Sequence, residues 1–234
     1  MKKYISNEFI EFKAQQILSN YEKKFGELTL PIPIEKIVFQ TFDLAIDYDE
    51  IFESGNIILG GICPRKKTIV LNIKHQNLFK EKPGLERFTI GHEAGHWEFD
   101  IDESTLDHPS LFINTENKYT ISKSKKYGTI SSFRGNIFNS LDKINTFRKF
   151  DSKDQARVVN RFSAALILPK NILRKKIDEF ENIRWKDLYN LCEKFSVTIT
   201  ALTVRLEQLK LVFIRDKEIY RNIDEINGQL AIKF

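Results

Sequence analysis

Residues 90–97 read IGHEAGHW and place two histidines four residues apart, with a glutamate directly after the first. In an α-helix, residues i and i+4 lie one above the other on the same face, so His92 and His96 can reach one ion. In zinc hydrolases with this pattern the glutamate, here Glu93, stays off the metal and takes a proton from the bound water. The motif therefore predicts a zinc site that performs hydrolysis.

Three features favour a metal site over a chance pattern on a surface helix. The chain contains four histidines, and two of them lie in this motif. Gly91 and Gly95 each cost up to about 1 kcal/mol against alanine in a helix, which is reasonable if another group must approach the helix closely. The apolar run TIVLN at 68–72 could supply an edge strand along which a peptide substrate pairs.

The segments before the motif have the spacing of regular elements. They predict a helix over 6–26 with Ser6 or Asn7 as its cap and Gly26 as its stop, a short helix after Pro31, a strand at 44–48, and a hairpin over 55–73. The motif itself is expected in a helix that begins near Pro83.

Regular patterns return only after a long polar stretch. Residues 99–150 are rich in Lys, Ser and Asn, lack a clear period, and are predicted to be an insertion that is either functional or poorly ordered. The following segments predict a helix from 152 to Pro169, a helix pair with its turn at 195–197, and two terminal strands, LVFIRDKEIY and QLAIKF. Together the segments predict an α+β fold.

The composition is that of an ordinary soluble globular protein, with 41% hydrophobic and 29% charged residues. No apolar run approaches the length of a membrane span, and the N-terminal residues lack the apolar core of a signal peptide. Cys63 and Cys192 lie far apart and form no C-x-x-C pattern, which is typical of reduced thiols. We therefore expect a cytoplasmic protein. The net charge of +5 permits an acidic partner, but scattered lysines give the same total.

Four stretches, in this order, make the chain resemble the ImmA/IrrE metallopeptidases of bacteria and their mobile elements. They are GGICPRKKTIVLN, RFTIGHEAGHW, NRFSAALILP and LCEKFSVTITALTVRLEQLKLV, and the likeness covers most of residues 30–212 outside the polar insertion.

The resemblance implies a small zincin-like peptidase that cleaves helix-turn-helix repressors. His92 and His96 match the metal ligands of the family, and Glu93 matches its catalytic base. The expected organisation is a metallopeptidase domain over 1–180, including the insertion, and a helix-turn-helix-like helix pair with a terminal hairpin over 181–234, packed on the first domain.

The chain departs from the family at the third metal ligand, which is a glutamate four residues before the asparagine that here is Asn160. That position is Ala156, whose methyl group cannot bind metal. Asp154 is two residues away, roughly 200° round a helix, and points elsewhere unless the first turn unwinds. Asp102 has the position of the third metzincin ligand, but Phe99 replaces the turn glycine of that pattern.

Other donors lie in the polar insertion. His108 and the carboxylates of 100–107 could reach the metal, although we expect each to be a solvated loop residue. Three accounts of Ala156 remain open: an engineered substitution that traps an inactive form, a ligand supplied by the insertion, or a decayed site that leaves a binding protein. A missing carboxylate should weaken metal affinity and leave the water less well oriented.

The sequence thus predicts a zinc-dependent endopeptidase that acts on a helix-turn-helix repressor. The alternative is a catalytically silent module of the same fold that sequesters a repressor or toxin. A third, weaker hypothesis is a DNA-binding regulator, because FSVTITALTVRLEQL resembles a helix-turn-helix. Four apolar residues in that segment have core spacing, which favours a packing role: Ile199, Leu202, Leu206 and Leu209.

Overall fold

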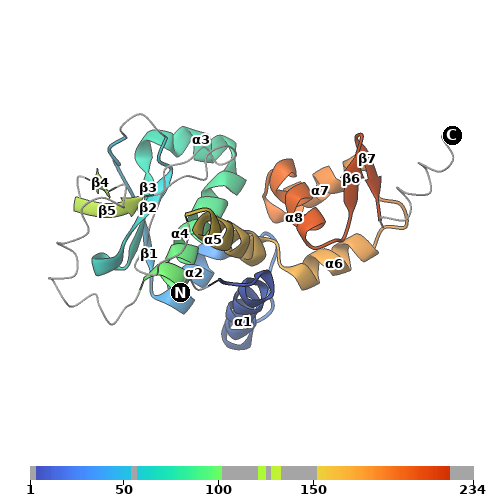
Figure 1. The fold of residues 1–234 in the computed structure, drawn as a ribbon, viewed down its shortest axis with the longest axis horizontal. Helices are drawn as coiled ribbons and strands as arrows, with labels where there is room; N and C mark the ends of the chain where they lie inside the picture. The colour runs from blue at the N-terminus through green and yellow to red at the C-terminus, as the bar shows by residue number, and fades with distance from the viewer. Residues whose placement is uncertain (1–3, 54–56, 102–120, 125–127, 133–151, 222–234) are drawn as a thin grey trace.

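The computed structural model describes residues 4–53, 57–101, 121–124, 128–132 and 152–221. Within these ranges, a mixed five-stranded sheet lies at one end of the molecule with most of the helices to one side of it, and a two-stranded hairpin follows the last helix (Figure 1). The predicted α+β class is confirmed.

The main sheet has the strand order β1-β3-β2-β5-β4. Its strands are β1 (Ala45–Asp49), β2 (Gly60–Cys63), β3 (Thr68–Asn72), β4 (Ile121–Ser124) and β5 (Gly128–Ser132). β1 runs parallel to β3, whereas the pairs β2–β3, β2–β5 and β4–β5 are antiparallel. The predicted hairpin is confirmed as β2 and β3.

The prediction that TIVLN is an edge strand is wrong, because β3 lies between β1 and β2. All five of its residues are buried, as is typical of a strand that is covered on both faces. Ile69 and Leu71 face the main core, whereas Val70 joins a second apolar cluster with Ile51, Ile58 and Cys63. The alternation of side chains across the strand separates these two sets.

The two N-terminal helices form where the sequence predicts them. In α1 (Asn7–Phe25), the Ser6 hydroxyl accepts a hydrogen bond from the Phe9 amide at 3.2 Å, and Gly26 ends the helix with a φ of 92°. α2 (Ile34–Phe42) follows the proline segment and leads into β1.

A short helix that the sequence did not indicate, α3 (Gln76–Glu81), precedes the long helix α4 (Pro83–Asp100). α4 packs against β2 and β3 on one side and against α2 and α5 on the other. The predicted insertion starts too early, because Phe99 and Asp100 belong to α4 and are each 2% exposed. β4 and β5 also fall within 99–150, so part of this range extends the sheet.

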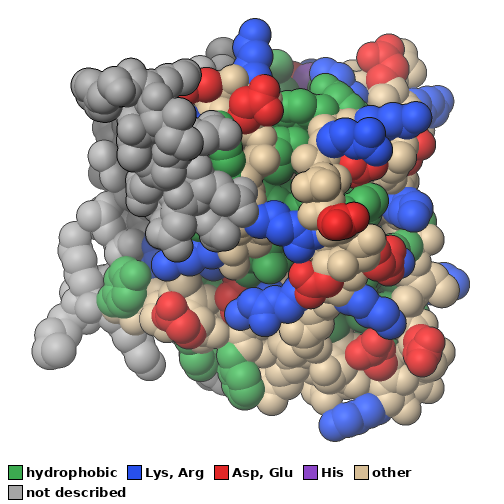
Figure 2. Space-filling model, turned by 90° about the vertical axis from the view of Figure 1, so that its right-hand side faces the viewer, with side chains coloured by type: hydrophobic (Ala, Val, Ile, Leu, Met, Phe, Trp, Pro, Cys, Tyr) green, Lys and Arg blue, Asp and Glu red, His purple; other side chains and the backbone are tan. Residues whose placement is uncertain are grey.

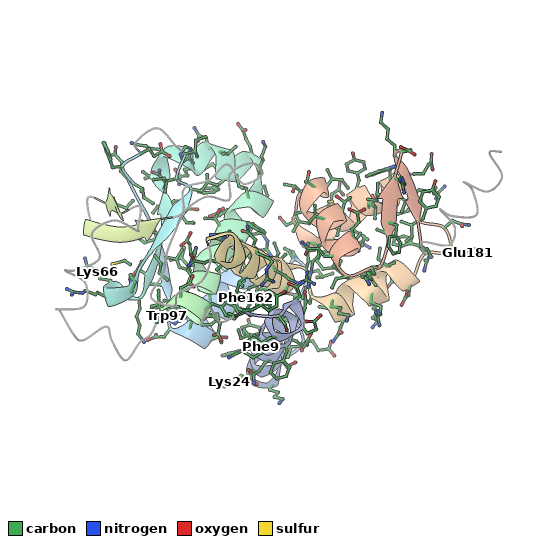
Figure 3. All side chains as sticks on the ribbon, in the orientation of Figure 1. Phe9, Lys24, Lys66, Trp97, Phe162 and Glu181 are labelled. Atoms are coloured by element: carbon green, nitrogen blue, oxygen red, sulfur yellow. The ribbon has the colours of Figure 1, made fainter. Side chains whose placement is uncertain are left out.

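The helices after the insertion are α5 (Ser152–Ile167), α6 (Lys170–Asp178), α7 (Trp185–Phe195) and α8 (Ile199–Gln208). The predicted helix pair is confirmed as α7 and α8, with Ser196 at a φ of 51° in the turn between them. The members of the main apolar cluster are spread along the sequence from Ile5 to Val212. They include buried residues of α7 and α8. Phe162 points from α5 into that cluster, where its ring meets Phe99 edge-on at a centroid distance of 5.2 Å (Figure 3).

The prediction of one strand in LVFIRDKEIY is wrong, because that segment contains both strands of the hairpin, β6 (Phe213–Arg215) and β7 (Glu218–Tyr220). Asp216 and Lys217 between them have φ values of 50° and 66°, as in the two-residue turns that join antiparallel strands. QLAIKF lies outside the described residues. Among the helices that the structure describes, none is long and apolar enough to cross a membrane.

Candidate metal centre

The two histidines of the motif lie on the side of α4 that faces α5. His92 and His96 are 4% and 8% exposed, and Glu93 is 2% exposed. The Nε2 atoms of the two imidazoles lie 3.1 Å apart, and the ring planes are inclined by 77°. The helix thus brings both nitrogens to one point, as the i, i+4 spacing predicts.

The Nδ1 atom of each imidazole lies within hydrogen-bond distance of a side-chain oxygen. Nδ1 of His92 is 2.9 Å from Oδ1 of Asn160 on α5. Nδ1 of His96 is 2.6 Å from Oδ2 of Asp100, which lies one turn further along α4. Because both oxygens accept, each Nδ1 donates, and this arrangement is typical of metal-binding histidines.

With hydrogen on both Nδ1 atoms, the lone pairs of the two Nε2 atoms face each other. Such an arrangement is repulsive unless a proton or a cation lies between the nitrogens. Two nitrogens at about 2.0–2.1 Å from a tetrahedral zinc ion are about 3.3 Å apart, close to the observed separation. The two imidazoles therefore fit zinc as two of its ligands.

The two histidines differ in their affinity for a proton. Burial and the neighbouring His96 hold the pKa of His92 well below its usual value, against the hydrogen bond to Asn160. Burial also lowers the pKa of His96, but the hydrogen bond and charge of Asp100 outweigh it and raise the pKa above its usual value. A proton between the two rings is therefore bound to His96 rather than to His92.

Burial also raises the pKa of Glu93 to about 7, with a further increase from Asp100 and a decrease from His96. A carboxylate that titrates near neutral pH can both accept and return a proton, so its pKa suits a general base and acid. The charge of His96 acts on Glu93, so the two side chains lie near each other in the site.

The glycines of the motif permit the close contact between α4 and α5. A Cβ at Gly91 would lie 2.6 Å from the Ser163 hydroxyl, and one at Gly95 would lie 3.1 Å from Cβ of Val159. The interpretation that something approaches this helix is confirmed, and α5 is what approaches. Its close approach brings Asn160 within hydrogen-bond distance of His92.

Ala156 is buried on α5 one helical turn before Asn160, so the position of the missing ligand lies in the helix that contacts the histidines. Among the residues that the structure describes, no three His, Cys, Asp or Glu side chains are grouped to hold a metal ion. Asp102, His108 and the side chain of Asp154 lie outside the described part of the chain.

Asp100 is the site residue that the sequence analysis placed wrongly. We expected it to be a solvated loop residue, but it is buried in the last turn of α4 and accepts hydrogen bonds from His96 and from Nε2 of Gln155, the latter at 2.8 Å. Its spacing of four residues from His96 was the available signal. It repeats the spacing of the histidine pair and places Asp100 on the same helical face.

Compared with models of protein families and with curated proteins, the chain gives no match.

The second helix of the pair, α8, offers little basic surface for DNA. The only Lys or Arg within α8 is Arg205, which is 1% exposed and binds the Glu11 carboxylate through Nη1 and Nη2 at 2.6 and 2.7 Å. On the face that includes the C-terminal elements, Lys and Arg side chains alternate with Asp and Glu (Figure 2). Among the described residues on this face, the charges do not form the single-sign patch that binding to phosphates requires (Figure 2).

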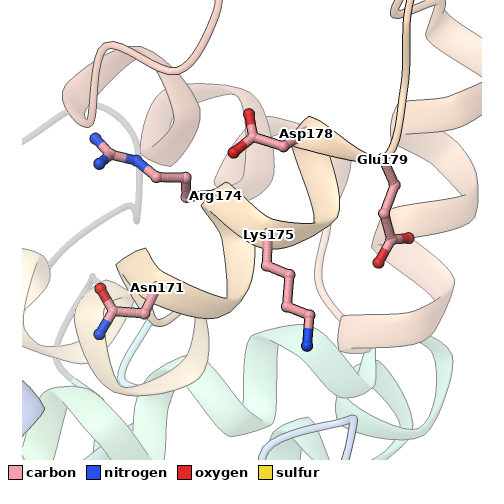
Figure 4. A pocket seen from close by; sticks show the side chains of 5 residues that line it. All are labelled: Asn171, Arg174, Lys175, Asp178 and Glu179. Atoms are coloured by element: carbon pink, nitrogen blue, oxygen red, sulfur yellow. The ribbon is translucent and has the colours of Figure 1, made fainter.

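A shallow pocket lies over the exposed face of α6, away from the histidines (Figure 4). It is lined by Asn171, Arg174, Lys175, Asp178 and Glu179. Its cationic and acidic residues are spaced four apart on one helix, as in the ion pairs of solvated helices. The pocket therefore has the chemistry of an ordinary surface.

Proposed function

We propose that the protein is a zinc-dependent endopeptidase of the zincin-like type, with a helix-turn-helix repressor as its substrate. The observation that supports this most is the convergence of His92 Nε2 and His96 Nε2 to 3.1 Å, with both Nδ1 atoms held by oxygen acceptors. The order of elements, with α4 packed on β2 and β3, supports the fold.

The residues of the site have complementary roles in this proposal. His92 and His96 would hold a zinc ion, which would supply a Lewis acid for the peptide carbonyl and for the attacking water. Glu93 would accept a proton from that water and return it to the leaving amine, which its pKa of about 7 allows. Asn160 and Asp100 keep the imidazoles oriented.

The identity of the substrate rests on the resemblance to ImmA/IrrE peptidases. The buried Arg205 and the mixed charges on the C-terminal face count against the chain itself reading DNA. A DNA-binding protein as substrate is compatible with both observations.

The test begins with zinc affinity at position 156. Ala156→Glu should bind zinc at least about tenfold more tightly than the wild type, because it restores a carboxylate next to the histidines. Ala156→Gln is the matched control, since it has the same size without the charge and should leave zinc affinity unchanged. The measurement is a competition titration against a chromophoric chelator.

The second part of the test is cleavage. The wild type and Ala156→Glu are incubated with zinc and the repressor encoded beside the gene, and the products are analysed by mass spectrometry. We expect two specific fragments, and none with Glu93→Gln, which should still bind zinc. Identical fragments with Glu93→Gln, or no fragments with either active form, would refute the proposal.

A second candidate function is a silent binding module, and Ala156 is the observation that favours it. A site with two histidines and no carboxylate would hold zinc weakly while the surface of the fold still binds a partner. Tight, zinc-independent binding of the intact repressor, unchanged in His92→Ala, would establish this alternative.

A further inference from the structure

The two histidines are held by acceptors of different chemistry. His92 donates to the neutral amide of Asn160, whereas His96 donates to the carboxylate of Asp100. We propose that Asp100 and Gln155 are a pair of positioning residues that fix the hydrogen of His96 on Nδ1 and so make His96 the dominant metal ligand; the metal-binding consequence rests on the proposed function.

The position of Asp100 is fixed from two helices. Its Oδ2 receives the His96 hydrogen at 2.6 Å within α4 and the Gln155 amide hydrogen at 2.8 Å from α5. Asp100 and Gln155 are each 2% exposed, so water does not screen the interaction. A buried carboxylate needs such donors to remain in place.

The carboxylate changes the electronic character of the imidazole as well as its orientation. A negatively charged acceptor on Nδ1–H increases electron density at Nε2, which makes that nitrogen a stronger ligand. The amide of Asn160 has no net charge and gives His92 the same orientation with a smaller increase. The structure therefore assigns the stronger ligand to His96 and the weaker one to His92.

A purely structural role for this pair predicts a different result. If Asp100 and Gln155 served only to join α4 to α5, removing the charge would lower stability without changing the tautomer of His96. The tautomer of the metal-free protein is thus the deciding observation, because it depends on the acceptor at Nδ1 and requires no activity.

The experiment uses Asp100→Leu in the full chain. Leucine has a similar shape but offers no acceptor to Nδ1–H of His96, so the hydrogen is free to move to Nε2. Nitrogen-15 NMR at alkaline pH, where both imidazoles are neutral, should show His96 with hydrogen on Nδ1 in the wild type and shifted towards Nε2 in the variant. Zinc affinity should fall by about 10–100-fold.

Two further variants keep the proposal testable if Asp100→Leu fails to fold. Asn160→Asp places a carboxylate next to Nδ1 of His92 as well and should raise zinc affinity. Gln155→Met removes one donor to Asp100 at similar size and should weaken zinc binding less than Asp100→Leu does.

An unchanged His96 tautomer in Asp100→Leu would overturn the proposal. So would an Asn160→Asp variant that binds zinc no better than the wild type while Ala156→Glu does. If the tautomer shifts as expected but no form of the protein binds zinc, the positioning role stands and the proposed peptidase function fails.

Discussion

A proton and a metal ion compete for the same place between His92 and His96. The lone pairs of the two Nε2 atoms face each other at 3.1 Å, and the raised pKa of His96 means that a proton occupies this place at lower pH. The environment that makes His96 a strong ligand for zinc also makes it a good base.

Zinc affinity should therefore decrease as the pH falls through the pKa of His96. Burial alone would lower this pKa, but the hydrogen bond and charge of Asp100 raise it above the usual value. Below that pKa, each pH unit should lower the apparent association constant about tenfold, because one proton must leave for one zinc ion to bind. The measurement is a chelator competition at several pH values. A flat profile across this range would contradict the competition, and Asp100→Asn should shift the decrease to lower pH.

At the next scale, the site depends on how closely α4 and α5 approach. Gly91 and Gly95 lie on the surface of α4 where Ser163 and Val159 of α5 make contact. A larger residue in either position would separate the helices and draw Asn160 away from His92.

Gly91→Ala should destabilise the protein by about 1–3 kcal/mol, although alanine is the better helix former by about 1 kcal/mol. Its Cβ would lie 2.6 Å from the Ser163 hydroxyl, which donates to the Phe88 carbonyl at 2.9 Å and cannot move freely. Chemical denaturation measures the change.

The double variant Gly91→Ala/Ser163→Ala is the control, because it removes the hydroxyl that the new methyl group meets. Gly91→Ala should also weaken zinc binding, because it draws Asn160 away from His92. The double variant should recover part of the lost stability and part of the lost zinc affinity. An increase in stability for Gly91→Ala alone would contradict the prediction, because it would show that the contact between α4 and α5 accommodates a methyl group at this position.

The elements with a strong local signal were predictable from the sequence. Ser6 and Gly26 bound α1 as expected, and the apolar spacing located α4, α5, α7 and α8. The place of β3 in the middle of the sheet was not predictable, because it depends on β1 pairing with it from a distant segment.

The histidines were found because their spacing alone places them on one helical face. Asp100 and Gln155 were missed for a physical reason: each looks polar and solvent-exposed in its own segment. Their burial results from contacts between α4 and α5. Asp100 and Gln155 are 55 residues apart in the chain.

At the scale of the whole molecule, the N-terminal and C-terminal helices meet at one carboxylate. Glu11 of α1 accepts hydrogen bonds from Nε of Arg161 at 3.0 Å and from both Nη atoms of Arg205. The Nε atom of Arg205 also donates to the Leu168 carbonyl at 3.1 Å. These bonds connect α1, α5 and α8.

Glu11→Gln should lower the free energy of unfolding by about 3 kcal/mol at neutral pH, because it leaves the buried guanidinium of Arg205 without its counter-charge. Burial raises the pKa of Glu11, but Arg205 and Arg161 outweigh burial and hold the pKa below its usual value. The stabilisation is thus fully present above the pKa of an unfolded glutamate and is lost as the pH falls through the lower pKa of the folded protein.

Denaturation of the wild type and the variant at about pH 7 and about pH 3 tests this pH dependence. The difference between them should be smaller in acid. Glu27→Gln, at an exposed position, is the control and should behave like the wild type at both values. An equal difference at both pH values would show that the carboxylate charge is not what stabilises the contact.

The bond between Glu11 and Arg205 also determines when the protein can finish folding during synthesis. The two residues are 194 positions apart, so α1 leaves the ribosome long before its partner in α8 has been made. Until then α1 exposes the apolar side that it later buries, which makes nascent chains vulnerable to aggregation. We expect folding to be completed only after α8 emerges, and chains that stop before it to depend on chaperones.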